Sequence, residues 1–428
     1  MSDPVKSFPR SERIADFREL VEFAKNARVE SGFGYLNSDA SIDTSRPVEL
    51  WISCRMTHVF SLAHLLGIEG ARELAEHGVR SLTRGFEDPE YGGWYSAIAH
   101  ELDEGRGVPV DDRKAAYAHA FVILASSSAS IAEIEGAREL LERALANQDE
   151  HWWEDAHAKV RESFNREFTQ TEDYRGVNAN MHTTESYLAA FDATDDVKWL
   201  DRAVGILSWV IDNQARQSQW RIPEHFDTNW NVRADYNIDK PKDPFRPYGY
   251  TPGHAFEWAR LAIHAGAQLH RIGRAVPEWI ESAAVELFNQ AVIDGWAADG
   301  ADGFVYTVGE DGAPVARERM HWVLCEALGA AATLARMADG SDGYARLEDS
   351  EVFRAQLDER MGAWWTYAKD KLIEKPGQWF HELDEKNEPS TVTWPGKPDA
   401  YHIAQMHLLP DLPLAPTFAR AIRDGNVW

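Results

Sequence analysis

Six histidines recur through the 428 residues of this chain at nearly regular steps, and each lies in a segment that is apolar or small on most of its faces. They are His58, His119, His182, His254, His321 and His402. The steps between them are 61, 63, 72, 67 and 81 residues, enough for one buried helix, one amphipathic helix and their loops. Because such a unit cannot bury its apolar face alone, the repeat predicts that successive units pack against one another.

The segments between these histidines are amphipathic. Apolar residues recur at positions i, i+3, i+4 and i+7, the period of a helix with one face on a core. Five such helices are expected at residues 15–27, 70–86, 136–148, 197–214 and 277–292. Six pairs of one buried and one amphipathic helix predict an all-α (α/α)6 barrel, with six inner and six outer helices. No linker rich in Pro, Gly or Ser interrupts the pattern, so residues 1–428 are expected to form a single domain.

Composition argues against several classes of partner and location. The chain carries 70 acidic and 44 basic residues, a formal charge of -26, so neither nucleic acid nor an anionic membrane is expected to bind it. The first residues lack the apolar core of a signal peptide, and no later stretch approaches the ~20 apolar residues of a membrane span, so a cytoplasmic location is expected. Cys54 and Cys325 stand far apart without a CxxC pair, which argues against a disulfide framework and a thiolate zinc site.

The least regular region, residues 221–253, is a long polar and aromatic segment of the kind that serves a binding site. It ends in the motif TPGH, so a turn is expected just before His254, which begins a helix. Glu257 follows one helical turn later, and a carboxylate at i+3 can hold an imidazole in one tautomer and raise its basicity. The same His-x-x-Glu spacing recurs at His182, but this pattern is also common in helix caps and cores.

Other polar and aromatic residues occur at corresponding ends of the buried segments. They are Arg55, Tyr117, Asn178, His182, Trp322, Glu326, Trp394 and His402. A pocket lined by Trp, Tyr, His, Arg and Asn suits a neutral polyol, because aromatic faces cover its C–H side while polar groups bind its hydroxyls. The alternative, that Trp and His only fill the interior of the barrel, accounts for single residues better than for the whole set.

Metal and nucleotide sites are not indicated. The HExxH motif is absent, and His58 and His64 are six residues apart, which does not place both rings on one ion. The sequence also lacks GxGxxG, P-loop and GxSxG motifs, so neither nucleotide cofactors nor serine-hydrolase chemistry is expected. We therefore expect neither a metal nor a cofactor.

Four segments carry a resemblance to a known family. They are RMTHVFSLAHLLG, NANMHTTESYLAAF, PFRPYGYTPGHAFEWARLA and GQWFHELDEKNEPSTVTWPGKPDAYH. From about Trp51 to His402 the chain resembles the N-acylglucosamine 2-epimerase superfamily, whose members fold as (α/α)6 barrels. Within it, the combination of RMTH, FRPYGxTPGH and WPGKPDxYH is most similar to the bacterial D-mannose isomerases and sulfoquinovose isomerases.

The resemblance implies roles for residues at matching positions. His254 and His402 match the two acid/base histidines, Glu257 is implied as the partner of His254, and Arg55 would polarise the enediolate oxygen. The implied substrate-binding residues are Trp51, Tyr117, Asn178, His182, Arg246, Trp322, Glu326, His381 and Trp394. Sulfoquinovose isomerases tend to carry a glutamine near the position of His381, so this histidine favours mannose over the sulfonated sugar.

By this resemblance the chain is expected to be an aldose–ketose isomerase that interconverts D-mannose and D-fructose through a cis-enediol without a metal, with D-lyxose and D-xylulose as a further candidate pair. The alternatives are a sulfoquinovose isomerase and a 2-epimerase acting on mannose and glucose. His402 is expected to move the proton between C2 and C1, and His254 to serve ring opening and oxygen protonation, although the reverse division fits as well. The substrate is a monosaccharide, and both a monomer and a homo-oligomer are compatible with the sequence.

Two other classes of function fit the same fold less well. A glycoside hydrolase or lyase needs paired carboxylates with separated pKa values, whereas the distinctive positions here are histidines. A non-catalytic sugar-binding or protein-binding barrel would bind its ligand without solvent exchange at C2 of the sugar.

We predict that His254→Ala and His402→Ala each abolish isomerisation and leave the fold intact. Each change removes one of the two imidazoles that exchange protons with the substrate, and one such group contributes about 10²–10⁴ in rate. Sugar conversion is followed by NMR and the fold by circular dichroism. Substantial activity in either variant would contradict the assignment.

Overall fold

The computed structural model describes residues 6–340, 343–344, 350–398 and 400–425, which are mainly helical with short strands. The chain divides into two compact units, each assembled from segments that are distant in the sequence. Unit 1 comprises Met1–Leu20, Leu207–Pro395 and His402–Thr417, and unit 2 comprises Val21–Ile206, Gly396–Tyr401 and Phe418–Trp428.

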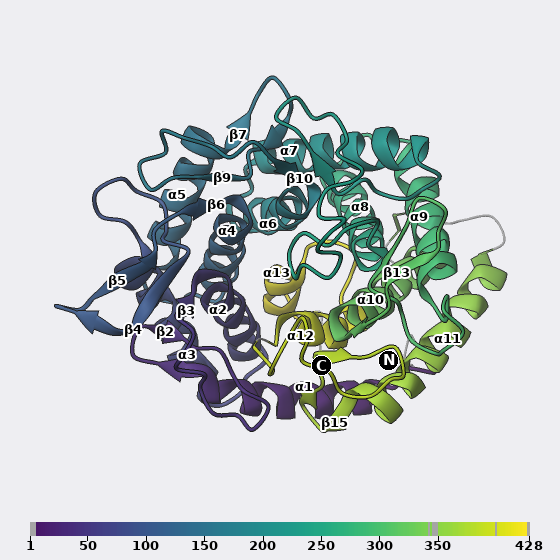
Figure 1. Ribbon diagram of the computed structural model, residues 1–428, viewed down its shortest axis with the longest axis horizontal. Coiled ribbons are helices and arrows are strands. Elements are labelled where there is room, and N and C mark those ends of the chain that lie inside the picture. Colours follow the sequence, from purple (N-terminus) through teal and green to yellow (C-terminus); the bar gives the residue numbers. More distant parts are fainter. Residues whose placement is uncertain (1–5, 341–342, 345–349, 399, 426–428) are drawn as a thin grey trace. The chain divides into compact units, whose positions relative to one another are not determined.

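The helices of unit 2 alternate along the chain between buried and amphipathic. They are α2 (Leu50–Leu65), α3 (Ala71–Arg80), α4 (Ala116–Ile131), α5 (Ala137–Asn147), α6 (Val177–Thr194), α7 (Val197–Leu207) and α13 (Phe418–Arg423). Helix α4 packs between α2 and α6, while α3 packs on α2 and α5 packs on α4 (Figure 1). Every residue from Leu50 to Ala63 is buried, as expected for a helix that is apolar or small all round.

Short antiparallel strands precede the buried helices of unit 2. The strands are β1 (Arg28–Val29), β2 (Gly32–Phe33), β3 (Val48–Glu49), β4 (Ala97–Asp103), β5 (Arg106–Asp111), β6 (Lys114–Ala115), β7 (Trp153–Glu154), β8 (Lys159–Val160), β9 (Ser163–Phe164) and β10 (Arg175–Gly176). Strand β3 pairs with β4 and runs directly into α2, and β6 pairs with β9 and runs directly into α4. This pairing fixes the residue at which each of these two helices begins.

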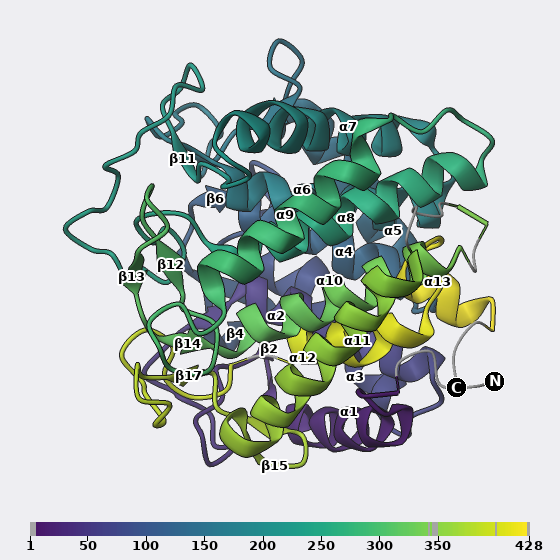
Figure 2. The ribbon, with the colours of Figure 1, turned by 90° about the vertical axis from the view of Figure 1, so that its right-hand side faces the viewer.

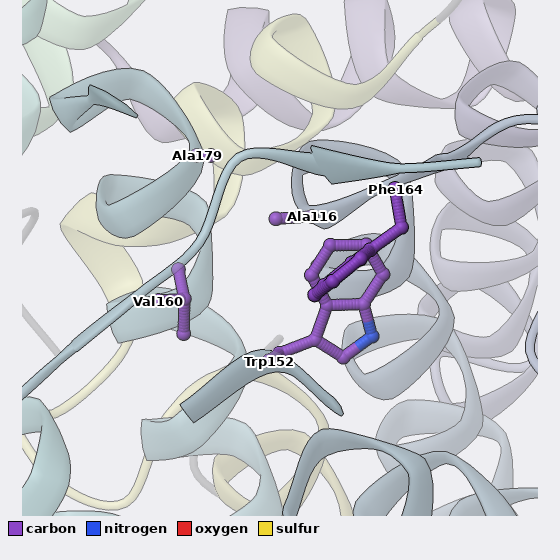
Figure 3. Packing of buried hydrophobic residues seen from close by; sticks show 5 residues of the cluster. All are labelled: Ala116, Trp152, Val160, Phe164 and Ala179. Atoms are coloured by element: carbon purple, nitrogen blue, oxygen red, sulfur yellow. The ribbon is translucent and has the colours of Figure 1, made fainter. Parts of the chain in front are cut away.

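Trp152 lies in a buried apolar cluster of unit 2 (Figure 3). The cluster comprises Ala116, Trp152, Val160, Phe164 and Ala179. The rings of Trp152 and Phe164 meet edge to face, with centroids 5.3 Å apart and planes at 73°. Because Ala116 and Ala179 lie in the first turns of α4 and α6, the cluster holds the N-terminal ends of both helices together.

Unit 1 follows the same alternation. Its helices are α1 (Arg10–Ala24), of which residues 10–20 belong to this unit, α8 (Pro252–Arg271), α9 (Trp279–Gly295), α10 (His321–Asp339), α11 (Ser350–Tyr367) and α12 (Tyr401–Leu408), which belongs to it from His402 onward. Helix α8 packs against α10, with α9 on α8 and α11 on α10 (Figure 2). Every residue from Pro252 to Leu269 of α8 is buried, whereas α9 buries one face through Ile280, Leu287 and Ala291.

The strands of unit 1 are two or three residues long. They are β11 (His225–Phe226), β12 (Thr307–Val308), β13 (Pro314–Ala316), β14 (Arg319–Met320), β15 (Ile373–Lys375), β16 (Gln378–Trp379) and β17 (Glu382–Leu383). Strand β14 pairs with β17, with Met320 opposite Glu382, and continues directly into α10. The start of α10 is therefore tied to the segment around residue 382.

Asp16 connects the N-terminal segment with α12 inside unit 1. Its carboxylate accepts hydrogen bonds from His407 Nε2 at 2.8 Å, the Gly377 amide at 2.6 Å and Trp379 Nε1 at 2.9 Å. Burial acts to raise the pKa of Asp16, but these hydrogen bonds and the charge of His407 outweigh it, so the pKa is lowered. The buried carboxylate thus stabilises the helix that carries His402.

The helices expected from sequence periodicity are confirmed. The five amphipathic ranges lie in α1, α3, α5, α7 and α9, and the buried segments lie in α2, α4, α6, α8 and α10. Helices α3, α5, α7 and α11 continue into π-helical turns at 81–86, 148–152, 208–215 and 368–372, which periodicity did not indicate. None of the helices in the described ranges is long and apolar enough to cross a membrane. The single domain stays a prediction.

We predict that Gly78→Ala destabilises the protein, because the new Cβ would lie 2.0 Å from Thr57 Oγ1, where α3 packs on α2. Overpacking of this kind costs about 1–3 kcal/mol, more than the roughly 1 kcal/mol that Ala gains over Gly in a helix. Gly205→Ala in α7 is the matched control: its nearest contact is 4.0 Å away, so it should raise stability slightly. Thermal unfolding compares the two variants, and equal stability would contradict the close packing.

Candidate active site

Several predicted site residues occupy the same position in their helices. The second residue of a buried helix is Trp51 in α2, Tyr117 in α4, Asn178 in α6, Trp322 in α10 and His402 in α12. Strands lead directly into α2, α4, α6 and α10, so the first turn of each of these four helices begins at a fixed residue. Since Cα–Cβ bonds tilt toward the N-terminus of a helix, the side chains project toward that end.

His254 in unit 1 lies in the first turn of α8, after Pro252 at the start of the helix. Gly253 is required at this turn, because a Cβ there would lie 2.4 Å from the Trp322 ring. The missing side chain lets α8 approach Trp322 closely. The TPGH motif therefore supplies both the start of the helix and the space for an aromatic neighbour.

A buried carboxylate holds the His254 ring, but it is not the one expected from the sequence. His254 Nδ1 is 2.9 Å from Glu224 Oε1, and Glu224 lies in the long segment 221–253, next to β11. The sequence assigned this partnership to Glu257, which instead forms an ion pair with Arg260 at 3.6 Å. The correction has a simple cause: the i+3 spacing brings Glu257 to the same side of α8, whereas the loop delivers a carboxylate directly to Nδ1.

His402 is held in the same way by Glu326. His402 Nδ1 is 2.8 Å from Glu326 Oε1, and Glu326 Oε2 accepts from Arg260 Nε at 3.3 Å and Nη2 at 3.1 Å. Arg260 is 1% exposed, so α8 contributes a buried cation that balances Glu257 and Glu326. A carboxylate oxygen only accepts, so in both pairs the proton is on Nδ1 and Nε2 is the nitrogen that would exchange a proton with a ligand.

Trp322 lies next to both of these histidines. Its ring is 5.3 Å from the His254 ring, with planes at 32°, and 5.7 Å from the His402 ring, with planes at 35°. The rings of His254 and His402, which are 148 residues apart in the sequence, thus lie beside the same indole inside unit 1. Two imidazoles, each held by a carboxylate beside an aromatic face, make an arrangement suited to moving protons on a ligand with C–H and O–H groups.

Glu257, Glu326 and His402 offer ligand-type atoms within 4.8 Å of one another, close enough to be tested as a metal site. Two observations argue against this use. His402 Nδ1 already bonds to Glu326, and the Arg260 guanidinium lies within 3.6 Å of both carboxylates. A bound cation would be repelled by Arg260, so the donor set fits an ion-pair network better than a metal.

His381 is buried and stacks on His321, with centroids 3.9 Å apart and planes at 24°. Its carbonyl oxygen is 3.1 Å from both the backbone nitrogen and Nδ1 of His321. The His321 ring lies 6.4 Å from His402. His381 therefore lies beside His321. We call His254, His321 and His402 the histidine cluster of unit 1.

Trp394 and Arg246 lie in the loops of unit 1. The Trp394 ring meets Phe245 edge to face at 5.3 Å, and Arg246 follows Phe245 and donates from Nη1 to the Tyr236 hydroxyl at 3.3 Å. Both loops are partly exposed, unlike the histidine cluster.

His225, next to Glu224, stabilises the long loop. Burial lowers its pKa, and the charges of Arg246 and His254 lower it further, against the Pro247 carbonyl and Glu224, which raise it. The neutral ring donates from Nε2 to the Pro247 oxygen at 2.8 Å. The loop end that carries Glu224 is thereby fixed by a histidine that the sequence did not single out.

Arg55 in unit 2 lies among aromatic rings. Its Nη2 donates to the Tyr117 hydroxyl at 2.9 Å, and its guanidinium is 5.1 Å from the Trp51 ring, 4.5 Å from Phe121 and 4.6 Å from Tyr401. The structure thus brings three predicted residues, Trp51, Arg55 and Tyr117, together.

His182 belongs to the same cluster. Its ring is 5.2 Å from Tyr117 and 4.6 Å from Phe121, and its Nδ1 is 3.6 Å from Glu185 Oε2, as the His-x-x-Glu spacing predicted. Asn178 lies one helical turn before His182 on the same face of α6.

The remaining histidines of the repeat are structural. Burial lowers the pKa of His58 to about 4, and His58 Nδ1 lies 2.7 Å from Ser128 Oγ. Burial likewise lowers the pKa of His119 to about 3, and its Nε2 accepts from the Trp94 amide at 3.1 Å. The repeat therefore predicts where histidines are buried, but not which of them act on a ligand.

The sequence pattern of the N-acylglucosamine 2-epimerase (GlcNAc 2-epimerase) family matches residues 32–406. The chain belongs to this family. It is 44% identical over 411 residues to the D-mannose isomerase of Thermobifida fusca, with 95% of each protein covered. It is 41% identical over 406 residues to the D-mannose isomerase of Pseudomonas cannabina pv. alisalensis, covering 95% of this chain and 93% of that protein.

Solved structures agree with the fold. A D-mannose isomerase crystal structure matches with a TM-score of 0.81 and 26% identity, over 96% of this chain and 98% of that one. The cellobiose 2-epimerase of Spirochaeta thermophila DSM 6192 matches with a TM-score of 0.77 at 18% identity, covering 94% and 95%, and supports the fold alone. The all-α (α/α)6 fold class expected from the sequence is confirmed.

We predict that Glu224→Ala releases His254 from its fixed tautomer, because the acceptor of the Nδ1 proton is lost. Nitrogen-15 NMR of the histidine side chains distinguishes the tautomers. Glu257→Gln is the matched control: it removes the carboxylate that sequence spacing suggested and should leave the His254 tautomer unchanged. A change with Glu257→Gln, and none with Glu224→Ala, would reverse our assignment.

Proposed function

We propose that this protein is an aldose–ketose isomerase that interconverts D-mannose and D-fructose. The observation that carries the proposal is the pair of carboxylate-held histidines, His254 and His402, whose rings both lie beside the Trp322 ring. The identity of 41–44% to D-mannose isomerases over 95% of the chain supports the choice of sugar.

The chemistry needs two proton-transfer groups. The sugar ring must open, the proton on C2 must be removed, and a proton must be returned to C1 through a cis-enediol while the oxygen protons move in parallel. No electrons leave the substrate, because C1 is reduced as C2 is oxidised. An imidazole is suited to both steps, since its ordinary pKa lies close to neutral pH.

In the proposed division, His402 moves the proton between C2 and C1 and His254 serves ring opening and oxygen protonation. Glu326 and Glu224 hold Nδ1 of the two rings, so that Nε2 faces the reaction in each case. Each carboxylate also stabilises the imidazolium that forms when its ring takes a proton, as an oriented acid group does in other His-based sites.

We extend the substrate-binding role to the aromatic and polar residues assigned by resemblance. These residues are Trp51, Tyr117, Asn178, His182, Arg246, Trp322, Glu326, His381 and Trp394. Indole faces cover the C–H side of a sugar, and Arg55 would stabilise the negative charge of the enediolate. We propose that the enzyme works in the cytoplasm, without a metal, on free monosaccharides.

The experiment is incubation with mannose, glucose, fructose, lyxose and sulfoquinovose separately in deuterated water, followed by NMR. We expect mannose and fructose to interconvert, with deuterium incorporation reporting how far the transferred proton exchanges with solvent. Glucose formed from mannose would favour a 2-epimerase, and conversion of sulfoquinovose alone would favour a sulfosugar isomerase. Binding without any conversion would contradict an enzymatic role.

His64→Ala provides a matched control for the two histidine variants. His64 is half-buried on α2, and its Nε2 lies 3.3 Å from Arg72 Nη1. It belongs to unit 2, and no role in the reaction is proposed for it. Wild-type conversion by His64→Ala, together with loss in His254→Ala and His402→Ala, would assign the chemistry to the paired histidines and not to histidine content in general.

A further inference from the structure

We propose that Glu382 is a positioning residue that holds Trp394 in place for sugar binding. The inference rests on the proposed function, because Trp394 is taken as part of the sugar site. Glu382 itself is 1% exposed and carries no role in the assignments above.

The carboxylate of Glu382 accepts hydrogen bonds from residues further along the same loop. Its Oε2 accepts the backbone N–H groups of Thr393 and Trp394, each at 2.7 Å, and its Oε1 accepts the Ser390 hydroxyl at 2.6 Å. The Ser390 amide also donates to the Glu382 carbonyl oxygen at 3.0 Å. One buried side chain thus fixes both ends of the segment 382–394.

The backbone of Glu382 fixes the same loop to the histidine cluster. Glu382 lies opposite Met320 in the β14–β17 pair. Helix α10 begins at His321, the residue after Met320, and Trp322 is its second residue. Glu382 therefore links two indoles: Trp322 through strand pairing and Trp394 through its side chain. Their relative placement does not depend on the exposed tip of the loop.

The segment that carries Trp394 is partly exposed. Val392, beside these residues, is 74% exposed, and the Trp394 ring has Phe245 as an edge-to-face neighbour on a loop that is itself partly exposed. The Trp394 side chain is intermediate between buried and exposed. The two amide hydrogen bonds fix the backbone from which this indole projects.

The proposed role of Glu382 is to accept hydrogen bonds and does not require its negative charge. Substitution by glutamine should therefore preserve the role, whereas substitution by alanine should remove it. In Glu382→Gln the side-chain oxygen can still accept both amides, and the NH₂ group can donate to Ser390 Oγ, which rotates to accept it. In Glu382→Ala both amides lose their acceptor, and a buried unsatisfied donor is costly. Asp384→Ala is the matched control: Asp384 also accepts two amides of this loop, those of Lys386 and Glu388 at 2.8 and 2.9 Å, but none near Trp394.

The first measurement is steady-state kinetics with mannose. We expect KM to rise about tenfold in Glu382→Ala with kcat nearly unchanged, equivalent to about 1.4 kcal/mol of binding, because an indole that covers the sugar acts equally in the ground and transition states. Glu382→Gln and Asp384→Ala should stay within about threefold of wild type. In a Trp394→Ala background the KM effect of Glu382→Ala should vanish, since the two residues act as one unit. Additive effects would overturn the proposal.

The second measurement is hydrogen exchange at the amides of residues 393 and 394, which does not require activity. We expect slow exchange in the wild type and in Asp384→Ala, and fast exchange in Glu382→Ala. Unchanged exchange in Glu382→Ala would overturn the proposed role of Glu382 whatever the kinetics show. If the wild type converts no sugar, the proposed function fails, whereas the exchange result still decides the role of Glu382 in the loop.

Discussion

The proposed chemistry depends on one kind of interaction, a buried carboxylate hydrogen-bonded to Nδ1 of a histidine. Glu224 holds His254 and Glu326 holds His402. Without a fixed tautomer, Nε2 of either ring could be a donor or an acceptor. Proton transfer needs one of these two forms at a given step. The carboxylates come from a loop and a neighbouring helix, so the loop segment 221–253 and α10 are as necessary as the helices that carry the histidines.

Burying these carboxylates has consequences for the surrounding structure. Two acidic side chains, Glu257 and Glu326, lie close together in the interior, and Arg260 balances them from the same helix that carries His254. Removing a partner from such a network is costly, because it leaves an uncompensated charge in a medium of low polarity. This explains why α8 is buried along nearly its whole length and yet carries three charged or titratable residues within two turns.

The buried helices repeat one arrangement along the chain, and their first turns carry most of the predicted site residues. Strands lead directly into α2, α4, α6 and α10, so the second residue of each helix occupies an equivalent place. Substitutions that alter substrate preference could occur at those residues, or in loops such as 382–394, without altering the packing of α4 between α2 and α6. Glu382, in β17, is an example of a position with no helical signal whose side chain binds the backbone amide of Trp394, a residue of the proposed site.

The sequence by itself determined the helical fold class and the alternation of buried and amphipathic helices, because periodicity is a local property of the chain. The resemblance to the family, and not the periodicity, singled out His254, His402 and Trp322, and the structure shows both histidine rings beside the Trp322 ring. The sequence did not determine that Glu224 and not Glu257 holds His254, nor that Arg260 and Glu382 matter. Those contacts join residues 30 to 66 positions apart, or join a side chain to the backbone of a loop. Only the tertiary structure decided them, because a loop's path follows from the packing of the elements it connects and not from its own residue pattern.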